Sequence, residues 1–397
     1  MDVKHFLRAF SFRLFFAVCA LNVIGILAIN SATNQSMAYV GRQATGMALG
    51  IAIIALICFV PYQKLLRYAV LVFVICAILL LMVRFFGRSV NGAKRWVVLP
   101  AIGQVQPSEF AKIGVVMFFA WLLGKNRESV NEPRFLLIFG AFAMIPIGLI
   151  SSEPDLSTTI VVTVSILAML FAAELSYRWI GLGMLVAVPF GVSSVFLLQR
   201  GMVPFLKDYQ VRRILAFLYP AKYADANWQQ DNSIMAIGSG QLFGKGLNNN
   251  TLASVKSGNF LSEEQTDFIF AVIGEEMGFV GCLLVLLLYA ILVYECFYLA
   301  GKARDMEGRI ICTGVGALIA FQGFSNIAVA TGIFPNTGLT LPFISYGVSS
   351  LLAFYVQIGL VINVGLQRRD IVHEDDMPRG RVGFGGKIPL SNLSKKE

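Results

Sequence analysis

Charged residues are scarce in this sequence of 397 amino acids, of which only 14% are Asp, Glu, Lys or Arg. A soluble domain usually carries about 25% charged residues, because it must cover its surface with groups that bind water. Hydrophobic residues make up 57% of the chain, and its mean hydropathy is +0.72. This composition excludes a soluble globular protein and makes lipid the solvent for most of the chain. The formal net charge of +9 therefore does not indicate nucleic-acid binding.

Histidine is nearly absent, since the chain has only His5 and His373, both in polar terminal segments. A histidine-based metal site or a Ser-His-Asp triad within the apolar body is therefore excluded. The six cysteines form no CxxC pair and all lie in apolar stretches, which indicates small packed side chains rather than zinc ligands or disulfides.

Long apolar runs are the main positive feature, and a membrane-spanning helix needs about 20 such residues. They lie near 12–31, 44–62, 67–86, 109–124, 135–151, 157–174, 177–198, 271–298, 310–333 and 343–366. These runs predict an all-α polytopic membrane protein of about ten transmembrane helices. We expect residues 1–369 to form this transmembrane domain, with a long extracytoplasmic segment at about 199–267 between helices 7 and 8. Residues 370–397 are expected to form a disordered cytoplasmic tail without a catalytic role.

The Lys and Arg residues of the termini and short loops predict the orientation, because such residues favour the cytoplasmic side. Most of them lie inside if both termini are cytoplasmic, which places the chain in the cell membrane as a multi-pass protein. Two basic clusters break this pattern. One surrounds Lys94 and Arg95 in a short outer loop, and the other includes Arg212 and Arg213 in the long outer segment. Positive charge kept on the outer side indicates a function there. The alternative is that long loops are translocated regardless of their charge, which explains the long segment but not the short loop.

The first outer cluster belongs to a motif, NGAKRW at 91–96, which is followed by QPSEFAK at 106–112. Adjacent cations beside a tryptophan at a membrane surface are suited to holding a phosphate. Glu109 and Lys112 are three residues apart on one helix face, so that a structural ion pair is the alternative to a functional role.

Two carboxylates, Glu153 and Asp155, stand at a membrane boundary in the motif EPDLSTT at 153–159. Asp155 or Ser157 can cap the following helix, and this explains one of these polar residues. Two acids exceed what a cap requires, and acids at a membrane boundary are functional candidates.

A glycine-rich stretch, GSGQLFGKG at 238–246, is similar in composition to a nucleotide-binding loop. It matches neither the dinucleotide fingerprint nor the P-loop. Phe243 stands where a dinucleotide fingerprint requires glycine, and Gly246 stands where a P-loop requires Ser or Thr. We expect a flexible extracellular turn.

Asp267 lies where the long outer segment re-enters apolar sequence, in TDFIF at 266–270. Beside Phe268 a carboxylate is partly desolvated, which raises its pKa as a general base requires. The alternative is that Asp267 caps the next helix. Glu276 follows in GEEMG at 274–278, and Ser345 lies in a neutral, Pro/Gly-broken stretch at 334–347. Such a stretch at membrane depth must line a cavity or be buried in protein.

These five stretches, in this order and over about residues 10–369, resemble the SEDS family (shape, elongation, division and sporulation). The resemblance implies a peptidoglycan glycosyltransferase that polymerises lipid II into glycan strands at the outer face of the cytoplasmic membrane, for elongation or division. It also implies a class B penicillin-binding protein transpeptidase as partner, and places the family's essential aspartate at Asp267. Gln241, Asn336 and Val348 depart from the usual family pattern, which leaves the subtype open.

Polymerisation of this substrate, a disaccharide-peptide on undecaprenyl pyrophosphate, needs a base for the acceptor hydroxyl and cations for the leaving pyrophosphate. Asp267 is the predicted catalytic base. The predicted substrate-binding residues are Lys94, Arg95, Glu109, Lys112, Glu153, Asp155, Arg212, Arg213, Glu276 and Ser345. No cofactor is required, although the acids would accept a divalent cation such as Mg²⁺ or Mn²⁺. A lipid II flippase and a non-catalytic scaffold of the wall-synthesis complex stay open as alternatives.

Overall fold

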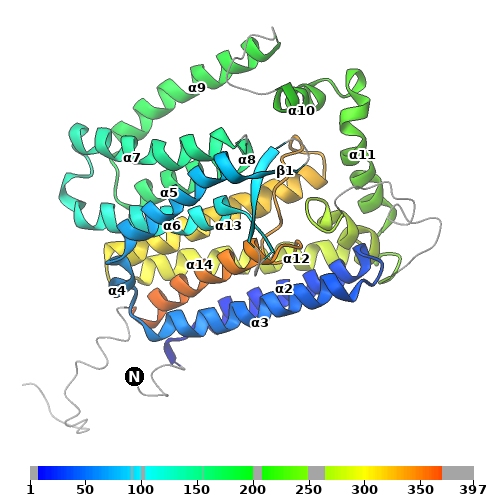
Figure 1. Ribbon diagram of the computed structural model, residues 1–397, viewed down its shortest axis with the longest axis horizontal. Coiled ribbons are helices and arrows are strands. Elements are labelled where there is room, and N and C mark those ends of the chain that lie inside the picture. Colours follow the sequence, from blue (N-terminus) through cyan, green and yellow to red (C-terminus); the bar gives the residue numbers. More distant parts are fainter. Residues whose placement is uncertain are drawn as a thin grey trace, which may run out of the picture.

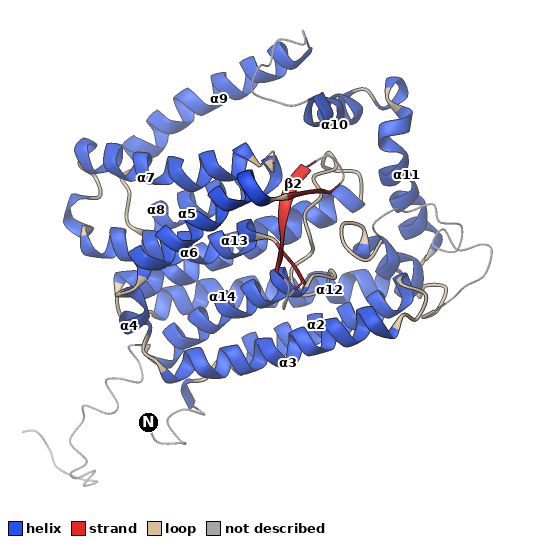
Figure 2. Cartoon of the chain, in the orientation of Figure 1, coloured by secondary structure: helices blue, strands red, loops and turns tan. Residues whose placement is uncertain are grey.

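The computed structural model describes residues 8–90, 93–99, 103–153, 155–199, 208–248 and 264–368. Helices dominate it, and most of them run alongside one another in one bundle (Figures 1 and 2). In chain order they are α2 (Phe12–Ala32), α3 (Met37–Phe59), α4 (Tyr62–Leu66), α5 (Ala69–Phe86), α6 (Pro107–Lys125), α7 (Pro133–Ser152), α8 (Leu156–Ala172), α9 (Tyr177–Gln199), α10 (Asp208–Leu218), α11 (Ala224–Ser239), α12 (Ile269–Lys302), α13 (Met306–Ala330) and α14 (Val348–Leu366), with short 3-10 turns η1 (Arg127–Ser129) and η2 (Pro220–Lys222). The predicted all-α membrane fold is confirmed.

A helix occupies each of the ten apolar segments predicted from the sequence. Seven helices of the described residues are long and apolar enough to cross a membrane, and α5 and α8 contain shorter apolar helices. The count of ten spans therefore stays a prediction. Two boundaries differ from expectation, because α3 begins at Met37 and α14 begins only at Val348, after a turn of equally apolar residues. The predicted tail at 370–397 and the parts 200–207 and 249–263 of the long outer segment lie outside the described residues.

The centre of the bundle consists of α6, α13 and α14, whose residues are mostly buried. Helix α13 packs against α6, α8, α12 and α14, while α14 also packs closely against α3. The outward faces of the other helices carry exposed apolar side chains, among them Phe16, Leu56 and Phe85. Such an apolar exterior is what a chain surrounded by lipid requires, since water would not solvate it.

A small antiparallel sheet interrupts the helical pattern, with strand order β1 (Arg88–Val90), β2 (Ala93–Leu99), β3 (Gly103–Val105). Arg88 pairs with Trp96 and Val97 pairs with Val105. The sequence did not predict these short strands. The sheet places Arg95 on β2 and leads directly to Pro107, which occupies the first turn of α6 as expected from its fixed φ.

Helix α9 stands apart from the bundle in Figure 1, and residues 181–193 are exposed on all its faces. Asn131, which lies in the turn after η1, anchors the beginning of α9. The backbone N–H of Ser176 donates to Asn131 Oδ1 (2.7 Å), and Trp179 Nε1 donates to the Asn131 carbonyl (3.1 Å). The helix thus projects from a polar anchor at the end of the bundle opposite the sheet.

Helix α12 is broken at Gly278, whose φ of 65° and ψ of −162° no helix contains. The break exposes backbone groups that the turn of residues 240–246 satisfies. Lys245 and Gly246 donate their N–H groups to the carbonyls of Glu275 and Glu276 (2.9 and 3.0 Å), and Phe279 N–H donates to the Gln241 carbonyl (2.8 Å). The structure therefore differs from the flexible turn expected for this glycine-rich stretch: its backbone is fastened to α12.

The close approach at Gly240 gives a stability test. A Cβ at this position would lie 1.9 Å from the Gly274 carbonyl oxygen, although the backbone conformation itself suits alanine. Gly240→Ala should therefore lower the free energy of unfolding by at least about 1–3 kcal/mol, the usual cost of overpacking. Gly238→Ala, at a position of α11 with open space around it, is the control. It should keep or raise the Tm in detergent, because alanine favours a helix by about 1 kcal/mol over glycine. Equal Tm values for the two variants would contradict this account of the turn.

Candidate active site

Asp267 ends the turn that leads into α12, and its side chain is half-buried. The residue at the N-cap position of this helix is Phe268, whose side chain has no group that can cap, and Asp267 stands one residue before it. The backbone carbonyl of Asp267 accepts a hydrogen bond from Asn326 Nδ2 in α13 (2.9 Å). This bond fixes the position of the aspartate backbone against the centre of the bundle.

Ser345 holds the same turn from the other side. Its Oγ donates to the Thr266 carbonyl (2.6 Å) and accepts from the Leu341 N–H (2.7 Å), while Tyr346 N–H donates to the Gln265 carbonyl (2.8 Å). The serine is buried. Its hydroxyl is thus engaged with backbone groups behind Asp267, which is a positioning arrangement rather than the substrate contact predicted from the sequence.

Arg213 of α10 shares one small space with Asp267. A Cβ at Gly338 would lie 3.3 Å from Asp267 Oδ2 and 3.7 Å from Arg213 Nη1, so both side chains converge on this glycine, which has a φ of +68°. Nη1 also donates to the Asn336 carbonyl (3.4 Å). Burial lowers the pKa of the Arg213 guanidinium, and the Asp267 carboxylate opposes that shift. Arginine stays protonated in proteins, so the site holds a fixed cation beside a carboxylate.

Arg95 adds a second cation to this region. Its Nη1 lies 3.8 Å from Asp155 Oδ1, and its Nη2 donates to the Tyr209 hydroxyl (3.3 Å), one helical turn before Arg213 on α10. Asp155 Oδ1 also accepts the Thr158 N–H (3.1 Å), which confirms the predicted cap of α8. The Arg95 charge lowers the pKa of Arg213, whereas Asp155 raises it. The two guanidiniums thus act on each other electrostatically, and both are influenced by Asp155.

Glu153 stands at the end of α7 and is 3% exposed. Neither of its carboxyl oxygens has a hydrogen-bond partner among the described residues. Burial and the neighbouring Asp155 raise its pKa to about 8, although Arg95 acts in the opposite direction. The two acids therefore differ in kind. Asp155 is a carboxylate that caps α8 and is paired with Arg95, whereas Glu153 is a buried acid without a partner among the described residues.

The predicted pair of Glu109 and Lys112 lies deeper, on α6. Lys112 Nζ lies 2.8 Å from Glu109 Oε1 and donates to Gln322 Oε1 (2.9 Å), and the lysine is fully buried. The structure confirms the ion pair. Gln322 Nε2 in turn donates to the Thr340 carbonyl (3.0 Å), so that the pair supports the loop at 331–347 that faces Asp267.

Two predicted residues are not brought into this cluster, Arg212 and Glu276, and a third, Lys94, has a side chain that lies outside the described residues. Arg212 is exposed on α10. Glu276 accepts a hydrogen bond from Ser31 Oγ of α2, beside the turn at 240–246. The sequence placed Glu276 near Asp267 by its spacing of about two helical turns, but those turns carry it away along α12.

Four residues of the site escaped the sequence analysis, namely Tyr209, Gln322, Asn326 and Gly338. A signal for three of them existed. Gln322 and Asn326 are four residues apart on one face of an apolar span, and polar groups there usually bind other polar groups. Tyr209 stands four residues before Arg213, which is the spacing of neighbours on one helix face.

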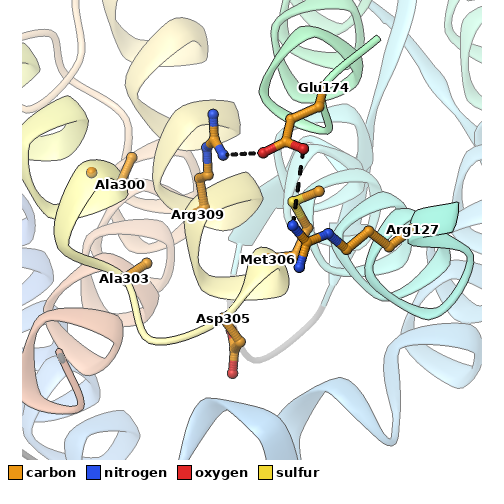
Figure 3. A pocket seen from close by; sticks show the side chains of 8 residues that line it. Arg127, Glu174, Ala300, Ala303, Asp305, Met306 and Arg309 are labelled. Carbon is orange, nitrogen blue, oxygen red and sulfur yellow. Dashed lines mark hydrogen bonds and ion pairs between the residues drawn. The ribbon is translucent and has the colours of Figure 1, made fainter. Parts of the chain in front are cut away.

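A hollow lies elsewhere, at the opposite end of the bundle (Figure 3). Its volume is about 300 Å³, and its wall includes Arg127, Glu174, Asp305 and Arg309. Glu174 bridges the two arginines, at 2.9 Å from Arg309 and 3.9 Å from Arg127. Its lining contains none of the predicted site residues. This hollow joins the ends of α6, α8 and α13 and is separate from the Asp267 cluster.

Fold and site together define a polytopic helical membrane protein with a fixed carboxylate and two arginines at one end of its bundle. The family model of cell cycle proteins that covers FtsW, RodA and SpoVE matches residues 7–370. The chain belongs to this family, which confirms the resemblance found in its sequence.

Individual relatives cover most of the chain. The peptidoglycan glycosyltransferase MrdB of Escherichia coli K12 is 34% identical over 353 residues, which are 88% of this chain and 92% of MrdB. The probable peptidoglycan glycosyltransferase FtsW of Trichlorobacter lovleyi is 34% identical over 380 residues, or 90% and 94% of the two chains.

Two solved structures share the fold. A chain of a peptidoglycan synthase complex that coordinates polymerization and crosslinking has a TM-score of 0.75 and 28% identity, over 91% of this chain and 98% of that one. The rod-shape-determining protein RodA of Thermus thermophilus has a TM-score of 0.66 and 27% identity over the same shares.

The buried ion pair gives a test by double substitution. Lys112→Met leaves the Glu109 carboxylate buried without its cation, which should lower the free energy of unfolding by about 3–5 kcal/mol. The double variant Glu109→Gln/Lys112→Met removes both charges and should lose clearly less. The measurement is the Tm of each purified protein in the same detergent. If the double variant is less stable than Lys112→Met, the two charges do not stabilise one another and the pair has another role.

Proposed function

We propose that this chain is a peptidoglycan glycosyltransferase that polymerises lipid II at the outer face of the cell membrane. The observation that carries the proposal is the convergence of Asp267 and Arg213 on Gly338, with Arg95 close by. A carboxylate beside fixed guanidiniums is what transfer of a sugar from a diphosphate requires. Membership of a family that includes curated glycosyltransferases supports the same conclusion.

In the proposed reaction, Asp267 accepts the proton of the acceptor sugar hydroxyl as that oxygen attacks the anomeric carbon of the donor. The bond to the diphosphate breaks, and the diphosphate leaves with its electron pair and stays on the polyprenyl chain. A positioned base contributes about 10²–10⁴ in rate. Such a displacement inverts the anomeric configuration.

Arg213 and Arg95 are assigned to the leaving diphosphate. Their guanidiniums keep their charge at any working pH, and they are held in place before the substrate arrives by Asn336 and Tyr209. Cations fixed in advance stabilise charge that develops in the transition state without reorganising at that moment. This mechanism needs no cofactor, and Mg²⁺ or Mn²⁺ is not assigned a step in it.

The orientation and the partner belong to the same proposal. Both termini are placed in the cytoplasm, because the basic residues of the short loops then lie inside. The Asp267 cluster, at the other end of α12 from Lys302, then faces outward. A class B penicillin-binding protein is the proposed partner, since a structurally similar chain belongs to a complex of polymerization and crosslinking.

The central prediction concerns Asp267. Asp267→Asn keeps the size of the side chain but removes the group that accepts the proton, so it should reduce glycan formation by about 10²-fold or more. The assay supplies purified protein and its transpeptidase partner with labelled lipid II and resolves the products by length. Asp225→Asn, an exposed carboxylate in the first turn of α11, is the matched control and should polymerise normally. Long glycan strands from Asp267→Asn would refute the role of Asp267 as base.

A second prediction separates two neighbouring arginines of α10. Arg213 is half-buried beside Asp267, whereas Arg212 is exposed. Arg213→Gln should lower kcat/KM for lipid II by about 10²-fold, because it removes a preorganised positive charge. Arg212→Gln should stay within about twofold, since exposed charges contribute little. The same polymerisation assay measures both, and similar losses in the two variants would show that long-range charge, not position, matters.

A further inference from the structure

Glu153 is unusual among the buried charged groups at this end of the bundle. Asp155 is paired with Arg95, and Glu109 is paired with Lys112. Glu153 is as buried as they are, yet both its oxygens lack a hydrogen-bond partner among the described residues. A buried polar group without a partner is costly, so natural proteins retain one where a ligand completes it.

The surroundings of Glu153 decide which form of the group is stable there. From α8 the Asp155 carboxylate repels a second negative charge, and from β2 the Arg95 guanidinium attracts one. Arg95 is already engaged with Asp155 and with Tyr209 of α10. On α6, Glu109 and Lys112 bind each other. Burial and Asp155 therefore outweigh Arg95, and they raise the pKa of Glu153 to about 8.

A neutral carboxylic acid has one O–H donor, which a carboxylate lacks. In the described structure this donor has no acceptor. Arg95, whose charge acts on both Glu153 and Arg213, is a cation that suits an anion. An ionised Glu153 would repel such an anion, and a neutral one would bind an oxygen of it. The identity of the anion rests on the proposed function, in which the leaving group is a diphosphate.

We infer that Glu153 acts as a neutral carboxylic acid that donates a hydrogen bond to an oxygen of the bound polyprenyl diphosphate. It is a binding residue for the diphosphate and not the base, and its proton stays on Glu153 throughout the transfer. In this arrangement each of three residues has its own role in binding the diphosphate. Asp155 holds Arg95, Arg95 supplies the charge, and Glu153 supplies a donor that adds no charge.

The sign of the pH dependence follows directly. Below pH 8 Glu153 is mostly neutral and donates, and above pH 8 it ionises and repels the diphosphate. Affinity should therefore fall by about tenfold between pH 7 and pH 9, one unit to either side of a pKa of about 8. The second ionisation of a phosphate group has a pKa of about 6, so the ligand is already about nine-tenths ionised at pH 7 and gains little further charge by pH 9.

The experiment measures the affinity of the full-length protein in lipid nanodiscs for undecaprenyl pyrophosphate at pH 7 and pH 9. Undecaprenol, which has the same chain without the diphosphate, is the ligand control and should bind equally at both pH values. Glu153→Gln keeps a donor that does not titrate. Since an amide donates more weakly than a carboxylic acid, it should bind about threefold more weakly than wild type at pH 7 and about threefold more tightly at pH 9.

Two further variants complete the design. Glu153→Ala has no donor and should bind at least about tenfold more weakly than wild type at pH 7. Glu132→Gln changes an exposed carboxyl group at the other end of α7 and should keep the wild-type pH profile. The Tm of each variant shows that it is folded.

Each of three results would overturn the inference. The first is a wild-type affinity that does not change between pH 7 and pH 9. The second is an equal fall in wild type and Glu153→Gln, which would assign the titration to another group. The third is a folded Glu153→Gln that binds as poorly as Glu153→Ala at pH 7, which would show that the negative charge is needed. A wild-type affinity that does not change with pH overturns the inference even if a variant does not fold. Because the assay involves binding alone, its result is independent of whether Asp267 is the catalytic base.

Discussion

Backbone polar groups cannot be left without hydrogen bonds inside a membrane, and this constraint shapes the end of the bundle that carries the site. The loop at 331–347 and the turn before α12 are not helical, so other residues must satisfy their N–H and C=O groups. Gln322 and Asn326 do so from α13, and Ser345 does so from within the loop. The position of Asp267 is a product of these bonds. The rigidity of the site therefore depends on the amide side chains that bond to its backbone.

Buried charged side chains, like buried backbone groups, have partners within the protein. Lys112 has Glu109, and Lys245 has Glu275, because a buried charge without a counter-charge costs several kcal/mol. Arg213 and Arg95 differ, since each is held partly by neutral groups, the Asn336 carbonyl and the Tyr209 hydroxyl. Each also lies near a carboxylate, Asp155 for Arg95 and Asp267 for Arg213. The site therefore holds cations and carboxylates side by side, and an anionic substrate has to share the guanidiniums with these acids.

Much of the fold followed from hydropathy, because a segment that crosses lipid must satisfy its backbone as a helix. The same measure failed at the start of α14, where the apolar residues Phe343 and Ile344 lie in a turn before the helix. It also missed the sheet, whose strands are too short for a periodic pattern. In the site, charge and motif led to Asp267, Arg95, Asp155 and Arg213. They could not lead to Gln322, because the bonds of an uncharged amide depend on packing between distant helices.

The clamp on Asp267 also sets when the site can form during synthesis. Thr266 and Ser345 are 79 residues apart, and the turn before α12 has no such support until the later residue has emerged. At a synthesis rate of about 5–20 residues per second, this interval lasts roughly 4–16 s. Throughout that time the insertion machinery handles a chain whose aspartate is present but not yet fixed. A nascent chain therefore cannot consume precursor until its last helix is in place, which ties the onset of activity to the completion of membrane insertion.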